Sequence, residues 1–143
     1  MKVSEVMTRE PESLGLTATC GEAATLMKQE DCGSIPIVED GRLVGIVTDR
    51  DIVIRAVAAG KDPKTTPVSA VMSADPVTIS PDSDTEEASQ VMAERQIRRL
   101  PVVRDGRLEG IVVIGQLARR EDEGELLKQI SEPLSNSGSH GRG

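Results

Sequence analysis

The chain has 143 residues, a net charge of −7, 37% hydrophobic residues and no Phe, Tyr or Trp. An acidic chain without aromatic side chains lacks both the cationic surface that neutralises phosphates and the platforms on which unpaired bases stack, which argues against nucleic-acid binding. The apolar runs are far shorter than the roughly 20 residues of a membrane span, and Glu5 precedes any apolar signal region. We therefore expect a cytoplasmic protein without a membrane anchor.

The sequence is a tandem duplication. Moving residues 3–52 by 65 positions places them on residues 68–117 without a gap and gives about 17 identities. Because a chain of this length can bury one moderate core or two small ones that share a surface, our leading expectation is one compact unit built from two repeats. The predicted divisions are a first repeat at 1–60, a linker rich in Pro and Thr at 61–67, a second repeat at 68–120, a C-terminal helical segment at 121–132 and a flexible tail at 133–143.

Each repeat begins with a short helical turn followed by a short strand. Ser4 and Ser69 are candidate N-caps for these turns, because their hydroxyls can accept bonds from the first free backbone amides. Short strands are expected near residues 13–16 and 77–80. Each turn is separated from its strand by a proline, which cannot continue a helix.

An amphipathic helix of about three turns follows in each repeat. Thr19 and Asp84 are cap-type residues, and Thr19 has Glu22 three positions later, the spacing of a capping box. Apolar residues then recur at helical spacing in both copies.

A β-hairpin and a second helix complete each repeat. Asp40-Gly41 and Asp105-Gly106 stand between runs rich in branched residues, and Asp-Gly is a strong hairpin signal because glycine adopts a positive φ at little cost. The expected hairpin strands are 35–39, 43–47, 100–104 and 108–114, and the expected helices are 49–59 and 115–120.

This organisation resembles a pair of cystathionine-β-synthase (CBS) domains, also called a Bateman module. The resemblance rests on the segments VSEVM and VSAVM, SIPIVEDGRLVGIVTDRDI and RRLPVVRDGRLEGIV, and it covers residues 3 to about 120. The stretch TDRDIVIRAVAAGKDP is also similar to small stand-alone bacterial members of the hypoxic response protein type, which act in stress responses.

The resemblance implies an α/β (α+β) fold of two β-α-β-β-α repeats related by a pseudo-two-fold axis, with sheets packed together and helices outside. It implies clefts between the repeats that hold a regulatory adenosyl ligand: AMP, ADP, ATP or S-adenosylmethionine. It also implies that modules pair into homodimers through their helices.

The segment from Thr48 to Asp51 is the candidate ligand site. Thr48 stands where a strand becomes a helix, so its hydroxyl and the free amides of the first helical turn form a natural anion site. Arg50 offers several donors to a phosphate, and Asp51 can accept bonds from a ribose diol. The alternative is ordinary helix capping by Thr48 and Asp51, with Arg50 in a solvated ion pair.

The family's Gly-x-x-Thr-x-x-Asp pattern matches Gly45, Thr48 and Asp51. By that resemblance, Gly45 allows close approach of the ligand, Thr48 contacts ribose or phosphate, and Asp51 holds the ribose. Ile35 and Leu16, on neighbouring strands, are the expected apolar walls for the base.

The second repeat lacks this polar set, because Val113, Ile114 and Gln116 take the corresponding places. We therefore expect at most one well-formed adenosyl site per chain. Arg98 and Arg99 are candidates for a contact with phosphate, although solvent-facing charges at a helix–strand junction explain them equally well.

The sequence offers no catalytic or metal-binding framework. Cys20 and Cys32 stand at the two ends of a predicted helix, about 18 Å apart at 1.5 Å per residue, which is too far for a mutual disulfide. The single histidine, His140, lies in the Gly/Ser-rich tail, so no His-dependent nucleophile site or zinc-site spacing is present. We expect a protein that is not an enzyme.

A second functional hypothesis is a ligand-free dimeric scaffold for an unknown protein partner. Its basis is the unmatched second site and an apolar helix face formed by Ile54, Val57 and Ala58, which would mediate self-association.

Overall fold

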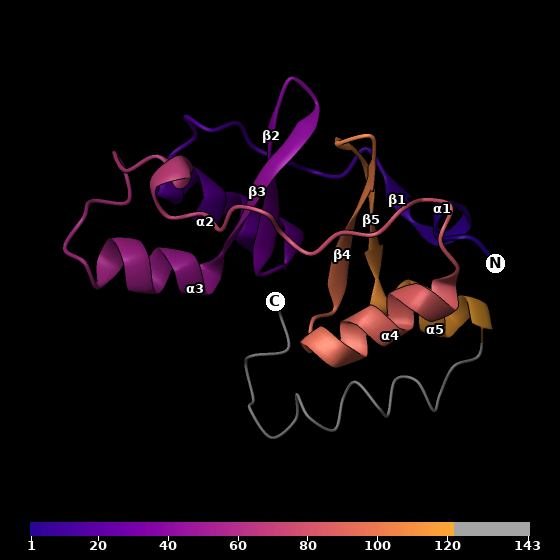
Figure 1. Ribbon diagram of the computed structural model, residues 1–143. Helices are drawn as coiled ribbons and strands as arrows, with labels where there is room; N and C mark the ends of the chain where they lie inside the picture. The colour runs from indigo at the N-terminus through magenta and orange to yellow at the C-terminus, as the bar shows by residue number, and fades with distance from the viewer. Residues whose placement is uncertain (122–143) are drawn as a thin grey trace. The chain divides into compact units, whose positions relative to one another are not determined.

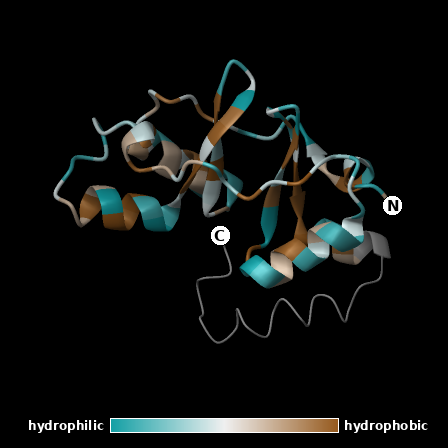
Figure 2. Ribbon diagram, in the orientation of Figure 1, coloured by the Kyte–Doolittle hydropathy of each residue, from teal (hydrophilic) through white to brown (hydrophobic). Residues whose placement is uncertain are grey.

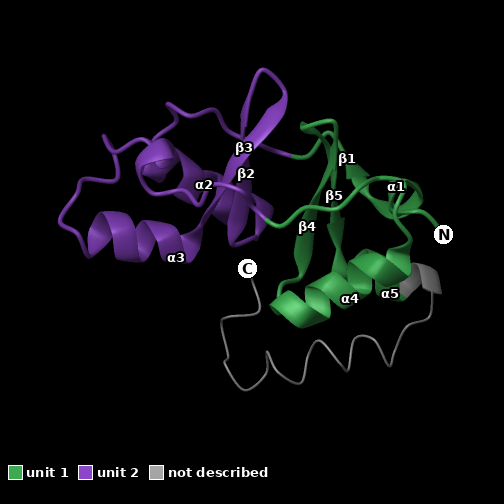
Figure 3. Cartoon of the chain, in the orientation of Figure 1, with its two compact units in different colours: residues 1–11, 77–143 green, residues 12–76 purple. Residues whose placement is uncertain are grey.

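The computed structural model describes residues 1–121, which fall into two compact units (Figure 3). Unit 1 contains Met1–Pro11 and the chain from Val77 onward, and unit 2 contains Glu12–Pro76. Each unit therefore includes the opening segment of the other repeat, Met1–Pro11 in unit 1 and residues 68–76 in unit 2. The segments expected at 122–132 and 133–143 lie outside the described residues. The observed mixture of helices and antiparallel strands confirms the predicted fold class.

Unit 2 combines a helix, a hairpin and an irregular second helix. Its elements in chain order are α2 (Cys20–Glu30), β2 (Ser34–Glu39), β3 (Arg42–Thr48), α3 (Asp49–Ile52), the π-helical turn η1 (Val53–Val57) and the 3₁₀ turn η2 (Val68–Ala70). The predicted helix over 49–59 is confirmed in position (Figure 1). Its middle is a π turn in which the Ala58 amide donates to the Val53 carbonyl.

Unit 1 repeats this plan and adds a short strand that the sequence did not predict. Its elements are α1 (Val3–Val6), β1 (Thr8–Arg9), α4 (Thr85–Arg95), β4 (Arg99–Arg104), β5 (Arg107–Val113) and α5 (Ile114–Glu121). β1 pairs antiparallel with β5, so the N-terminal segment is tied to the hairpin of the second repeat. Among residues 1–121, no helix is long and apolar enough to cross a membrane.

Both hairpins turn at the predicted Asp-Gly pairs. Asp40 and Gly41 have φ values of 52° and 80°, and Asp105 and Gly106 have values of 52° and 82°. Two successive positive φ values are what a two-residue turn needs to match the twist of its strands. The turns fix the register, so that Ser34 lies opposite Thr48 and Arg99 lies opposite Val113.

The caps of the long helices are partly as predicted. Thr19 and Glu22 form a full capping box, with each side chain accepting a bond from the other's backbone amide at 3.1 and 3.0 Å. Asp84 occupies the N-cap position of α4 but makes no capping bond, and its carboxylate lies 3.4 Å from the N-terminal ammonium group. Both helices have 11 residues, or three turns.

The prediction that Ser4 and Ser69 cap the short turns is wrong. α1 begins at Val3 with Lys2 at the N-cap, and η2 begins at Val68. The first amides of α1 need no side-chain cap because those of Val3 and Ser4 donate to backbone carbonyls of Ser83 and Pro81 at 2.8 and 3.0 Å.

The strands expected near 13–16 and 77–80 are each reduced to one bridge. Leu14 pairs with Ile37 in unit 2, and Ile79 pairs with Val102 in unit 1, both parallel.

Each unit has its own aliphatic core. Figure 2 shows that hydrophobic residues occur along the strands and helices of both units. In unit 2 the buried residues are Cys20, Ala23, Met27, Ile35, Ile37, Val47, Ile52, Ala56, Val68 and Val71. In unit 1 they are Val3, Val6, Met7, Ile79, Ala88, Met92, Leu100, Val102, Val112, Ile114 and Leu117. The segments 3–7 and 68–72 thus contribute Val and Met residues to a core that contains the other repeat's hairpin.

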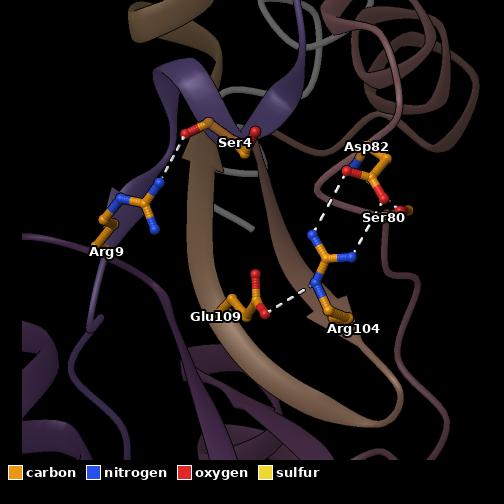
Figure 4. A network of polar contacts seen from close by, with 6 residues as sticks. All are labelled: Ser4, Arg9, Ser80, Asp82, Arg104 and Glu109. Atoms are coloured by element: carbon orange, nitrogen blue, oxygen red, sulfur yellow. Dashed lines mark hydrogen bonds and ion pairs between the residues drawn. The ribbon is translucent and has the colours of Figure 1, made fainter.

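The surface of unit 1 carries a small ion-pair network around Arg104 (Figure 4). Its guanidinium contacts Asp82 through two nitrogens at 3.2 and 3.4 Å and Glu109 at 3.1 Å. The hydrogen bond to Asp82 and the two nearby carboxylates raise the pKa of Arg104. These side chains face solvent, so the network organises the hairpin surface without enclosing a site.

Candidate ligand site

Thr48 and Asp51 form a reciprocal pair at the junction between β3 and α3. The Asp51 amide donates to Thr48 Oγ1 at 3.0 Å, and the Thr48 amide donates to Asp51 Oδ2 at 2.9 Å. The capping interpretation is therefore correct. The pair can still form further hydrogen bonds, because Asp51 Oδ1 and the Thr48 hydroxyl proton take part in no hydrogen bond within the described residues.

The start of β2 lies beside this junction. Ser34 pairs with Thr48, and the Asp49 amide donates to the Gly33 carbonyl at 2.9 Å. Ser34 is 7% exposed and Ile35 is 2% exposed. The structure therefore brings together Thr48, Asp51 and the Gly33–Ile35 segment in one unit.

The remaining predicted residues are less closely tied to the pair. Arg50 is exposed, and its backbone amide, rather than its guanidinium, bonds the Asp49 carboxylate at 2.8 Å. Leu16 is half-buried and packs against the core of unit 2. Contact of Arg50 with a phosphate, and of Leu16 and Ile35 with a base, stay predictions.

Gly45 has a structural role that the sequence did not reveal. A Cβ atom at this position would lie 2.6 Å from Met72 Sδ and 2.9 Å from the Ser73 carbonyl oxygen. The missing side chain thus lets the chain's own 72–73 segment pack on β3. Close approach of a ligand to Gly45 stays a prediction.

The corresponding junction of unit 1 is occupied by its own side chains. Gln116 Oε1 accepts a bond from the Val113 amide at 3.0 Å, and Gln116 Nε2 donates to Thr8 Oγ1 at 2.7 Å. In a capping box, a Glu or Gln at the third helical position accepts a bond from the backbone amide of the N-cap residue. Gln116 stands at that position, so the sequence did contain this signal. Among the described residues, Gln116 thus takes the place that the Asp51 carboxylate holds in unit 2.

Arg98 lies next to that junction. Its carbonyl accepts a bond from the Ile114 amide at 2.9 Å, as Gly33 does for Asp49 in unit 2. Its Nε is buried without a hydrogen-bond partner among residues 1–121. Contact of Arg98 or Arg99 with a phosphate stays a prediction.

Unit 2 also has an open groove of about 640 Å³ along α2. Leu14, Glu22 and Lys64 are among its lining residues, and neither Thr48 nor Asp51 reaches it. The groove is therefore separate from the candidate site.

The cysteines are both free thiols. Cys20 is fully buried at the start of α2, and burial raises the pKa of its thiol. The Cys32 thiol is half-buried and lies 3.5 Å from the Ser34 carbonyl oxygen. Within residues 1–121, no three His, Cys, Asp or Glu side chains gather in a way that could hold a metal ion.

Comparison with known protein families agrees with this arrangement. The model of the CBS domain matches residues 3–57 and again residues 68–123. The chain belongs to the CBS domain family. The resemblance inferred from VSEVM, the Asp-Gly hairpins and the Gly-x-x-Thr-x-x-Asp pattern is confirmed.

Two curated relatives match over nearly their full length. CBS domain-containing protein YhcV of Bacillus subtilis is 47% identical over 133 residues, which is 90% of this chain and 94% of the relative. Hypoxic response protein 1 of Mycobacterium tuberculosis is 35% identical over 135 residues, covering 92% of this chain and 94% of the relative. This CBS pair is thus similar to the stand-alone proteins that its sequence suggested.

Solved structures show the same fold. Hypoxic Response Protein I with two coordinated zinc ions has a TM-score of 0.76 and 36% identity, covering 83% of this chain and 98% of that chain. CBSX2 in complex with AMP has a TM-score of 0.72 and 25% identity, with coverage of 87% and 98%. The CBS domain pair of MJ0100, in complex with 5′-methylthioadenosine and S-adenosyl-L-methionine, has a TM-score of 0.71 and 27% identity, with coverage of 84% and 94%.

Proposed function

We propose that this protein is a non-catalytic regulatory module that binds an adenosyl ligand, of the AMP, ADP, ATP or S-adenosylmethionine type, at Thr48 and Asp51. The observation that carries the proposal is the reciprocal Thr48–Asp51 pair, in which Asp51 Oδ1 and the Thr48 hydroxyl proton have no partner in the part of the chain that the structure describes. A carboxylate oxygen accepts from a ribose hydroxyl, and a charge-assisted bond of this kind is among the stronger ones.

The related complexes support the choice of ligand class. CBSX2 binds AMP, and the MJ0100 pair binds 5′-methylthioadenosine and S-adenosyl-L-methionine. The chemical part common to these three ligands is adenine joined to a ribose, while their 5′ substituents differ in charge. An acceptor for the ribose is therefore the feature that a shared site needs most, and Asp51 supplies it.

The other site residues take supporting roles in this proposal. Arg50 is exposed on the first turn of α3, where its guanidinium can extend to a 5′ phosphate. Leu16 and the edge of Ile35 bound the base, and Gly45 allows the 72–73 segment to pack beside the site. The chain binds one ligand, because the junction of unit 1 is filled by Gln116. Regulation follows if the ligand binds one conformation of the module more tightly than another.

Isothermal titration with AMP tests the proposal, using Asp51→Asn as the decisive variant. The Asn side-chain oxygen can still accept the bond from the Thr48 amide, so the cap survives while the negative charge is lost. Loss of a charge-assisted hydrogen bond of about 1.5 kcal/mol or more weakens binding at least about tenfold. Glu22→Gln is the matched control, because it removes the same charge from the equivalent capping box of α2.

The expected result is one AMP per chain for the wild type, weaker binding for Asp51→Asn and unchanged binding for Glu22→Gln. A dye-reported melt gives a second readout, with about 2.7 kcal/mol of stabilisation at a hundred times the dissociation constant. If AMP, ADP, ATP and S-adenosylmethionine at millimolar concentration produce neither heat nor a melting shift, the proposal fails.

A ligand-free dimeric scaffold is the second candidate function. Val53, Ile54 and Val57 are exposed by 55, 51 and 57% on η1. Three large apolar side chains on one short helical surface are unusual for solvent and suit a protein interface. A dimer that forms without any ligand and binds none of the adenosyl compounds would favour this function over the first.

A further inference from the structure

Thr8 and Ser73 occupy equivalent places in the two units. Each follows the methionine of a VSxVM segment, and they are 65 positions apart in the sequence. Thr8 pairs with Ile111 of β5, and Ser73 pairs antiparallel with Ile46 of β3. Ile46 and Ile111 are also 65 positions apart, so the two hydroxyl residues share one register on their hairpins.

The glycines of the paired strands confirm this equivalence independently. A Cβ atom on Gly110 would lie 2.7 Å from Met7 Sδ and 2.6 Å from the Thr8 carbonyl oxygen. A Cβ atom on Gly45 would meet Met72 Sδ at 2.6 Å and the Ser73 carbonyl oxygen at 2.9 Å. The short segments therefore lie equally close to their strands in both units.

The two units differ in what reaches the hydroxyl. In unit 1 the Gln116 amide bridges the Val113 amide and Thr8 Oγ1, with bonds of 3.0 and 2.7 Å. In unit 2 Asp51 makes the first of these bonds, at 2.9 Å to the Thr48 amide. No hydrogen bond joins Asp51 to Ser73 within the described residues. Asp is one methylene shorter than Gln and has no N–H to donate, so the second half of the bridge is missing.

We propose that Ser73 is a further ligand-contacting residue and that a ligand hydroxyl completes this bridge. The ligand hydroxyl donates to Asp51 Oδ1 and accepts a bond from the Ser73 hydroxyl. It thereby takes the place that the Gln116 amide nitrogen fills in unit 1. This inference rests on the proposed adenosyl function and deepens it. It assigns to the start of the second repeat, through Ser73, a part in selecting ligands with a free ribose hydroxyl.

Titration of Ser73→Ala with AMP, 2′-deoxy-AMP and 3′-deoxy-AMP tests the contact. Loss of one neutral hydrogen bond weakens AMP binding about threefold to tenfold. The loss becomes smaller for the deoxy analogue that lacks the contacted hydroxyl. Thr8→Ala is the matched control and leaves AMP affinity unchanged. If Ser73→Ala binds all three nucleotides like the wild type, the contact is refuted while the proposed function stands.

A ligand-free measurement tests the placement of Ser73 separately. Gln at position 51 should form the bridge seen in unit 1, so Ser73→Ala should lower the melting midpoint more in an Asp51→Gln background than in the wild type, by about 2–4 °C. Equal effects in the two backgrounds refute the placement, and with it the proposal. If the wild type binds no adenosyl compound, the proposed function and the ligand contact both fail, whatever this cycle shows.

Discussion

Thr48 and Asp51 accept hydrogen bonds from each other's backbone amides, at 3.0 and 2.9 Å. The same two side chains therefore start a helix and present the free acceptor and donor of the candidate site. A substitution at either position changes stability and binding together. Experiments on this site need a second capping box in the same unit for comparison, and Thr19 with Glu22 supplies it.

Replacing Thr48 with Ala should lower the free energy of unfolding by about 1 kcal/mol, because the Asp51 amide loses its capping acceptor. Thr19→Ala should cost a similar amount. Urea denaturation followed by far-ultraviolet circular dichroism measures both, since the protein has no aromatic fluorescence. Only Thr48→Ala should also weaken AMP binding. Equal loss of binding in both variants would mean that stability alone is being measured.

Replacing Gly45 with Ala should destabilise unit 2 by about 1–3 kcal/mol through overpacking. The new methyl group would lie 2.9 Å from the Ser73 carbonyl oxygen, a backbone atom that cannot move without shifting its segment. Gly15→Ala is the control, because its nearest neighbour would be 4.0 Å away. Thermal melts of the two variants should separate clearly, and similar midpoints would contradict the packing role of Gly45.

The elements that could be predicted from sequence depend on nearby residues. Asp40-Gly41 determines a tight turn through its own φ values, and Thr19 with Glu22 caps a helix through contacts three residues apart. Because the two repeats match in sequence, the same signals predict the same elements in the second repeat. The Thr48–Asp51 pair was found for the same reason, because its hydrogen bonds are local.

The features that were missed depend on distant partners. β1 has only two residues, which carry no alternating pattern, and it exists because Thr8 and Arg9 pair with Ile111 and Gly110. Ser4 was wrongly assigned as a cap because carbonyls nearly 80 positions away satisfy the first amides of α1. The bond from Gln116 to Thr8 is equally non-local. None of these pairings can be recognised from residues that are close together in the sequence.

Cys32 should react with a disulfide reagent well before Cys20. Cys20 is 0% exposed, and burial raises its pKa, so both access and thiolate formation are limited. Cys32→Ser should remove the fast phase of thiol release, and Cys20→Ala should leave it unchanged. Equal rates for the two thiols would show that the start of α2 opens freely.

The raised pKa of Cys20 also predicts a direction for stability against pH. The unfolded chain releases the thiol proton at a lower pH than the folded chain does. This contribution to stability is complete below the ordinary thiol pKa and is lost as the pH rises through the higher folded value. Urea midpoints should therefore fall more steeply at alkaline pH in the wild type than in Cys20→Ala. Parallel curves would contradict the shift.

Ile54 tests whether the exposed surface of η1 holds two copies of the chain together. If Val53, Ile54 and Val57 pack against a second copy, the wild type should sediment as a dimer that dissociates on dilution. Ile54→Lys should raise the dimer dissociation constant at least about tenfold, since a desolvated ammonium group in an apolar contact costs more than 1.4 kcal/mol. Ala24→Lys adds the same charge at an exposed position of α2 and should leave association unchanged. A wild type that stays monomeric at every concentration removes the scaffold function and leaves the adenosyl site as the function to be tested.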